Sequence, residues 1–132
     1  MNVLAEILNA FHIFLLTTPF IGLVLSNKIL RTNALLVKIL ALVIFLIPLH
    51  WRFLDNQCAL SILSIKLGDS SYNTNTQSPF TRDNMGPIYK PLMKLFKLDW
   101  DSDKDLNFML SIHWVINFVV TWYVLSFKLC KN

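Results

Sequence analysis

Three long apolar blocks dominate this sequence and restrict it to very few folds. They run over residues 3–25, 34–54 and 106–127. Each holds about twenty residues, and at 1.5 Å per residue a helix of that length crosses the ~30 Å hydrocarbon core of a bilayer. Charged residues make up 15% of the chain, against about 25% in soluble domains. We therefore predict an all-α integral membrane protein with three transmembrane helices, forming a single domain over residues 1–132.

The first block is predicted to be a retained span. A cleaved signal peptide has a basic start and a small-residue cleavage site. This block instead begins with Glu6 and ends at residues 26–28, which read Ser-Asn-Lys. Pro19 and Gly22 are expected to kink its second half, because membrane helices tolerate both residues.

Residues 55–105 form the one long loop. A short helix is expected over 58–67, capped by Asp55 or Asn56, and the polar tract 70–78 is expected to be mobile. Residues 87–98 predict an amphipathic helix that lies flat in the headgroup region, the alternative being a helix packed against the loop. Its apolar face holds Ile88, Leu92, Leu95 and Phe96, and its basic face holds Lys90, Lys94 and Lys97. The expected membrane-interface residues are Trp51, Lys90, Lys94, Lys97 and Trp100.

Basic residues in the short segments predict the orientation. The first connector carries Lys28 and Arg31, and the tail carries Lys128 and Lys131, whereas no basic residue precedes the first span. Three spans then place the N-terminus outside and the C-terminus in the cytoplasm. Cys58 and Cys130 consequently fall on opposite sides of the membrane, so no internal disulfide is expected.

Polar residues inside the predicted spans are the candidate functional residues, because each is unfavourable in lipid unless it has a partner. Two stripes at helical spacing are expected to make helix–helix polar contacts. They comprise Asn9 and His12 in the first span, and His113, Asn117 and Thr121 in the third. The alternative is a cofactor or ligand site formed by His12, His113 and His50, either a bis-histidine haem, a metal or a proton relay. Haem would require His12 and His113 to face each other. No cofactor and no metal is our leading expectation.

Other chemistry finds little support in the residues. The alternating Asp99, Asp101, Asp103 and Asp105 lack the glycine and glutamate of a calcium loop. Ser102 followed by Asp105 instead indicates a helix start. The sequence has no nucleophile elbow and no phosphate-binding glycine-rich loop. No basic run is interleaved with stacking aromatics, so nucleic-acid binding is not expected.

One stretch resembles small multi-span membrane proteins of unknown function. The segment 50–61, HWRFLDNQCALS, and the segment that follows Phe80 and contains Gly86-Pro87-Ile88-Tyr89 carry the resemblance, together with His12. It is similar to a bacterial family with a Cys-Pro-Leu-Thr…Glu signature and to short proteins of large DNA viruses. The chain departs from that signature, with Ala59 for Pro, Ser61 for Thr and Ser64 for Glu. The resemblance implies the topology and no particular chemistry.

These features predict a non-enzymatic structural or accessory subunit of a viral or organellar membrane assembly. Its expected partners are the lipid bilayer and either further copies of itself or a larger membrane complex. Two alternatives stay open. One is a redox or proton-handling membrane protein that uses the three histidines, and the other is an oligomeric small pore lined by a polar stripe.

Overall fold

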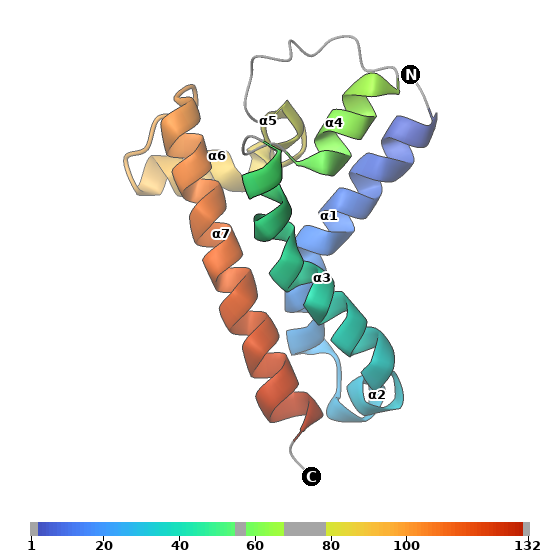
Figure 1. Ribbon diagram of the computed structural model, residues 1–132. Coiled ribbons are helices and arrows are strands. Elements are labelled where there is room, and N and C mark those ends of the chain that lie inside the picture. The colour runs from blue at the N-terminus through green and yellow to red at the C-terminus, as the bar shows by residue number, and fades with distance from the viewer. Residues whose placement is uncertain (1–2, 55–57, 68–78, 131–132) are drawn as a thin grey trace.

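A computed structural model describes residues 3–54, 58–67 and 79–130, and throughout these ranges the regular structure is helical (Figure 1). The elements in chain order are α1 (Val3–Val24), α2 (Asn27–Thr32), α3 (Ala34–Phe53), α4 (Ala59–Lys66), α5 (Pro79–Asn84), α6 (Gly86–Leu95), α7 (Asp103–Tyr123) and the π-helical turn η1 (Val124–Leu129). The predicted all-α class is confirmed. The expected cap at Asp55 or Asn56 and the polar tract 70–78 lie outside the described residues.

Three of these helices are long and apolar enough to cross a membrane, as the sequence predicted. They are Val3–Val24, Ala34–Phe53 and the continuous helix Asp103–Leu129 that α7 forms with η1. The third begins at Asp103, three residues before the apolar block, because the Ser102 side chain accepts a hydrogen bond from the backbone N–H of Asp105 at 3.3 Å. This is the helix start that Ser102 and Asp105 predicted. Serine is a preferred N-cap residue because its side-chain oxygen accepts a backbone N–H of the first turn in this way.

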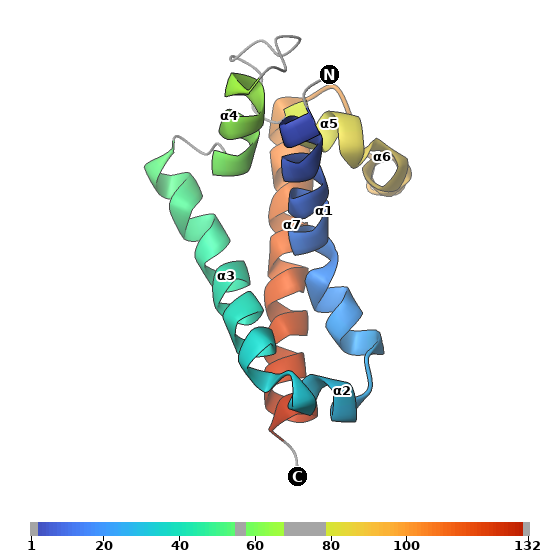
Figure 2. The ribbon, with the colours of Figure 1, turned by 90° about the vertical axis from the view of Figure 1, so that its right-hand side faces the viewer.

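The long helices run lengthwise, and the short ones lie at their ends (Figures 1 and 2). Helix α2 connects α1 to α3 at one end of the bundle, beside the end of α7. Helices α4, α5 and α6 gather at the opposite end, where α6 lies across α7 (Figure 1). We refer to these as the α2 end and the α4–α6 end.

The core lies mainly where α6 meets α7 and the neighbouring long helices. Its buried residues are Leu16, Ile44, Met85, Tyr89, Met93, Leu106, Met109 and Trp114. Trp51 of α3 packs edge-on against Trp114 of α7, with ring centroids 5.4 Å apart at 83°, a geometry that aromatic pairs favour. The core as a whole joins α6 to the three long helices.

Helix α6 ends three residues earlier than the amphipathic pattern suggested. Lys97 has a φ of 57°, and the N–H of Leu98 donates to the carbonyl of Met93 at 2.8 Å. The N–H of Lys97 donates to the carbonyl of Lys94 at 3.2 Å. These two bonds around a left-handed residue form a Schellman motif, which terminates a helix. Glycine usually holds this position, so the sequence pattern gave no stop signal.

One face of α6 is buried against the bundle, and its other two faces are exposed. Tyr89 and Met93 are buried against the bundle. The predicted apolar face instead stays exposed, and it comprises Ile88, Leu92, Leu95 and Phe96. The lysines Lys90 and Lys94 lie on a further exposed face. The binary apolar and basic pattern thus missed the side by which α6 packs on the protein.

Arg82 of α5 ties the loop to the start of α7. Its Nη1 donates to the carbonyl of Trp100 at 2.7 Å, and its Nη2 contacts Asp103 Oδ1 at 2.6 Å. The Trp100 ring also lies beneath two cations, with Arg82 Cζ at 5.9 Å and Lys90 Nζ at 5.2 Å from the ring centroid. Such cation–π contacts help to hold the short helices in place.

At the α2 end, Lys128 closes the last turn of α1. Its Nζ donates to the carbonyls of Gly22, Leu23 and Leu25 at 3.1, 2.6 and 2.6 Å. The last carbonyls of a helix have no partner within the helix, and a lysine is suited to them. Gly22 also allows α1 to approach η1 closely, because an added Cβ would lie 3.3 Å from Val124 Cγ2.

Candidate functional site

The polar stripe predicted on the third span lies on the side of α7 that faces the bundle. Asn117 is fully buried, Thr121 is 5% exposed and His113 is half-buried. Asn117 Nδ2 donates to the carbonyl of Leu16 in α1 at 3.3 Å. Among the described residues, Asn117 Oδ1 and Thr121 Oγ1 have no hydrogen-bond partner. Asn117 therefore bonds α7 to α1, whereas Thr121 has a hydroxyl without a partner among the described residues inside the bundle.

His113 connects α6 and α1 through its two ring nitrogens. Its Nδ1 lies 2.5 Å from the hydroxyl of Tyr89, and its Nε2 lies 3.4 Å from the carbonyl of Leu16. A carbonyl can only accept, so Nε2 carries the proton, and Nδ1 accepts from the phenol. Burial raises the pKa of Tyr89, which keeps this phenol protonated as the chain of bonds requires.

Three residues form a second group, the polar cluster beside α4, which we define as His12, His50 and Cys58. His12 lies on α1 and is 8% exposed. Its Nε2 is 3.6 Å from Cys58 Sγ, just ahead of α4. His50, on the last turn of α3, accepts a hydrogen bond at Nε2 from the N–H of Ala59, the first residue of α4, at 3.3 Å. The start of α4 thus receives side chains from two long helices.

This cluster combines a thiol and an imidazole, which are partners in several kinds of chemistry. An imidazole can accept a thiol proton, and the resulting thiolate is a nucleophile and a soft metal ligand. Among residues 3–54, 58–67 and 79–130, however, no group of three or more His, Cys, Asp or Glu side chains is placed to hold a metal ion. Both cysteines are free, with Cys58 half-buried and Cys130 exposed.

The two histidines considered for haem engage different partners. His12 Nε2 contacts Cys58, whereas His113 uses Nδ1 toward Tyr89 and Nε2 toward Leu16. An axial ligand needs one ring nitrogen free for iron. Haem binding through His113 would therefore break one of these two bonds, so the arrangement does not favour that alternative.

The remaining predicted positions are distributed along the chain as follows. Asn9 is half-buried on α1. Trp51 packs inward on Trp114, and Trp100 is half-buried beneath the side chains of Arg82 and Lys90. Lys90, Lys94 and Lys97 are exposed.

Sequence reasoning missed the contact between His12 and Cys58 and that between Tyr89 and His113. Each joins residues far apart in the chain, by 46 and 24 positions. Neither has a spacing signal, because helix periodicity relates only residues a few positions apart. The packing of α4 on α1 and the core contacts between side chains of α6 and α7 bring these pairs together.

Comparison with known proteins identifies no relative. No protein-family model matches the sequence, and no curated protein and no solved structure is similar to it.

Proposed function

We propose that this chain is an integral membrane protein that acts, without a reaction of its own, as a structural or accessory subunit of a membrane assembly. The observation that carries this proposal is the outward surface of the three long helices. Large apolar side chains cover it, among them Leu35 at 74%, Val119 at 64% and Trp122 at 66% exposure. Water would strongly disfavour such continuous apolar surface, whereas lipid or a neighbouring helix accommodates it.

The polar side chains of the bundle support a structural role. His113 and Asn117 both reach the carbonyl of Leu16, and Tyr89 reaches His113. In lipid, such interhelical hydrogen bonds are worth about 0.6–2 kcal/mol each. They hold α1, α6 and α7 together and leave the outer faces for lipid or partners.

The charge distribution supports a cytoplasmic α2 end and an N-terminus outside. Lys28, Arg31 and Lys38 belong to α2 and the start of α3. Lys128 of η1, whose Nζ donates to the carbonyl of Leu25, lies at the same end of the bundle. No acidic residue occurs between Glu6 and Asp55 or after Asp105. Basic residues without acidic neighbours typify the cytoplasmic side of short connectors.

Two measurements test this function. We expect the protein to stay in the membrane fraction after alkaline carbonate washing and to enter solution only with detergent. Purified in mild detergent, it should then form a homo-oligomer or retain a stoichiometric partner, as shown by native mass spectrometry. Release by carbonate alone would overturn the membrane placement. A monomer without any bound partner protein, purified in mild detergent from cells at native expression level, would overturn the subunit role.

Sidedness has its own test. With Cys58→Ser, Cys130 becomes the single cysteine, and it is exposed. In intact cells, a membrane-impermeant maleimide added from outside should label Cys130 only after the membrane has been permeabilised. A reporter cysteine replacing the exposed Lys66, in a chain lacking both native cysteines, should show the reverse accessibility.

The contact between Cys58 and His12 favours a second function, thiol–disulfide exchange with a partner protein. His12 would take the thiol proton, and the Cys58 thiolate would attack one sulfur of the partner's disulfide. A mixed disulfide forms, the original S–S bond breaks, and the departing thiolate takes up the proton. Capture of a partner through Cys58 under non-reducing conditions, lost in Cys58→Ser and kept in Cys130→Ser, would support this function over the accessory one.

A further inference from the structure

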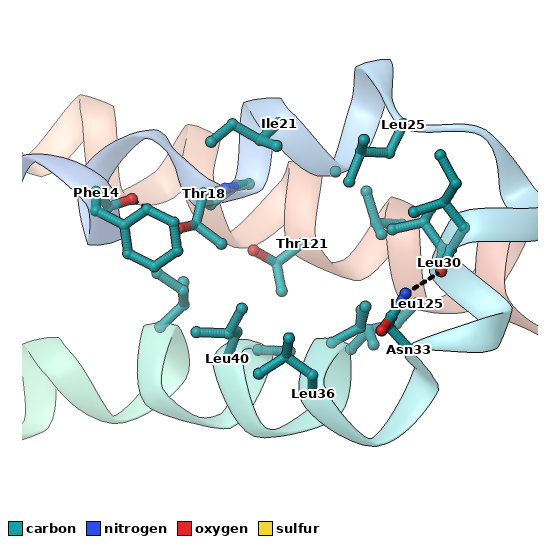
Figure 3. Close-up of a pocket in the computed structure, with 17 residues that line it drawn as sticks. Phe14, Thr18, Ile21, Leu25, Leu30, Asn33, Leu36, Leu40, Thr121 and Leu125 are labelled. Carbon is teal, nitrogen blue, oxygen red and sulfur yellow. Dashed lines mark hydrogen bonds between the residues drawn. The ribbon is translucent and has the colours of Figure 1, made fainter.

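A cavity of about 380 Å³ lies at the α2 end of the bundle. Helix α1 runs along one side of it and α3 along the other, with α7 behind and α2 near one end (Figure 3). In this view no helix crosses in front of the cavity. Its lining is almost entirely apolar, and the polar side chains in it are Thr18, Asn33 and Thr121.

The cavity is long in the direction of the helices. Along α1 its lining runs from Phe14 to Leu25, just past the helix end, and along α3 it begins just before the helix with Asn33 and reaches Ile44. The two ends are eleven positions apart on each side, which at 1.5 Å per residue is about 16 Å. Half of a ~30 Å hydrocarbon core is about 15 Å. The cavity therefore matches the depth of one leaflet.

Basic residues lie on the helices at the α2 end of the cavity. Lys28 and Arg31 are exposed on α2, whose Ile29 and Leu30 line the cavity, and Lys38 is exposed on α3. No acidic residue occurs in this part of the sequence. A lipid whose acyl chain enters the cavity from the α2 side would thus leave its headgroup near these cations.

From this we infer that the cavity holds one acyl chain of an anionic phospholipid from the leaflet at the α2 end. The inference rests on the proposed membrane embedding. The apolar lining and the one-leaflet length suit an alkyl chain, and the cations suit a phosphate headgroup. Thr121 is compatible with this occupant. Its buried hydroxyl has no hydrogen-bond partner among the described residues, so an acyl chain beside it breaks no hydrogen bond.

The test is native mass spectrometry of the full chain, delipidated in detergent. It is titrated with phosphatidylglycerol, with phosphatidylcholine of the same chains, and with the matching free fatty acid. We expect one phosphatidylglycerol per chain, bound more tightly than phosphatidylcholine. Each of Lys28→Gln and Arg31→Gln should weaken that preference about fivefold. Binding of the fatty acid with no phospholipid bound would overturn the assignment.

Filling the cavity separates this site from lipid bound elsewhere on the surface. Ala41 lines the cavity and is 5% exposed, so Ala41→Phe should lower phospholipid affinity at least tenfold. Ala10→Phe, at an exposed position on α1, is the matched control and should leave affinity unchanged. Equal binding by both variants would overturn the inference. Should Ala41→Phe lose helicity by circular dichroism, Leu36→Phe serves as the second filling variant, since Leu36 also lines the cavity.

One further variant distinguishes an alkyl chain from a ligand with a polar group at mid-cavity. Thr121→Val removes the hydroxyl with little change in shape. An acyl chain should bind this variant at least as well, whereas loss of binding would show polar recognition at Thr121 and overturn the acyl-chain assignment. None of these outcomes depends on carbonate resistance, so the site and the membrane placement can fail separately.

Discussion

Cys58 Sγ lies 3.6 Å from Nε2 of His12, although 46 residues separate the two in the chain. The contact joins the start of α4 to the middle of α1, and His50 bonds to the next residue, Ala59. The reactivity of the Cys58 thiol should therefore depend on the His12 imidazole beside it.

We expect His12→Leu to slow alkylation of Cys58 by iodoacetamide severalfold near pH 7, in a Cys130→Ser background. The reason is that the thiolate is the reacting form and that the His12 imidazole is placed to accept the thiol proton. The measurement is the alkylation rate of the two proteins at one pH. The control is Cys130 in a Cys58→Ser background, whose rate should not respond to His12→Leu. Equal rates at Cys58 with and without the imidazole would leave the contact with a packing role only.

Asn117 and His113 are predicted to depend on each other, since both reach the carbonyl of Leu16. We expect Asn117→Leu and His113→Leu each to destabilise the protein by about 1 kcal/mol. The double variant should lose more than the sum, because only then is the Leu16 carbonyl left without either donor. Unfolding in mixed detergent micelles measures this, and strict additivity would contradict a shared acceptor.

The pKa of Tyr89 is raised by burial, and this predicts a loss of stability at high pH. A raised pKa means that the folded state holds the phenol proton more tightly than the unfolded state. The contribution is therefore complete below the ordinary pKa of about 10 and declines as the pH rises toward the folded value. In Tyr72→Phe/Tyr123→Phe, ultraviolet titration of the remaining tyrosine should give a pKa above 10. Tyr89→Phe should abolish this decline in stability at high pH. It should also lower the free energy of unfolding by about 1 kcal/mol, because the bond to His113 is lost.

Lys128→Met is expected to destabilise the protein by about 2 kcal/mol, because the carbonyls of Gly22, Leu23 and Leu25 lose a charged donor. Thermal unfolding in detergent, or in micelles with added denaturant, checks this. Lys38→Met, at an exposed position on α3, is the matched control and should stay within about 0.5 kcal/mol of the native chain. A similar loss in both variants would point to general charge effects instead.

Lys97→Gly is predicted to stabilise the end of α6 by about 1 kcal/mol. Lys97 has a φ of 57°, a conformation that is unfavourable by roughly 1–2 kcal/mol for residues with a Cβ and free of that strain for glycine. Lys97→Val should destabilise by a comparable amount, since a β-branched residue suits this conformation least. Equilibrium unfolding of the three proteins gives the order, and a Val variant as stable as the Gly variant would contradict this reading of the turn.

The long helices were predictable because their signal is local. About twenty consecutive apolar residues define each of α1, α3 and α7, and the structure places their ends within a few residues of the expected boundaries. The start of α7 also followed from a local signal, because Ser102 caps the helix by accepting a hydrogen bond from the N–H of Asp105.

The contacts between helices were not predictable in the same way. The bond between Tyr89 and His113 and the contact of Cys58 with His12 depend on how α6 and α4 pack, which no spacing in one sequence encodes. Helix α6 illustrates the limit. The sequence pattern divided its residues into an apolar and a basic face, but Phe96 and Lys97 lie beyond the end of the helix. Tyr89 and Met93, which form the buried face, fell outside that two-sided pattern.

Lys128 also has a consequence for the order of assembly. It lies 106 residues after Gly22, so α1, α2 and α3 are all synthesised before the donor for the last carbonyls of α1 exists. Until η1 has been made, water must hydrate that helix end, or lipid headgroups in the proposed membrane placement. Completion of the last turn of α1 is thereby coupled to the packing of the α7–η1 helix, and a ribosome that stalls within α7 would leave α1 with a frayed end.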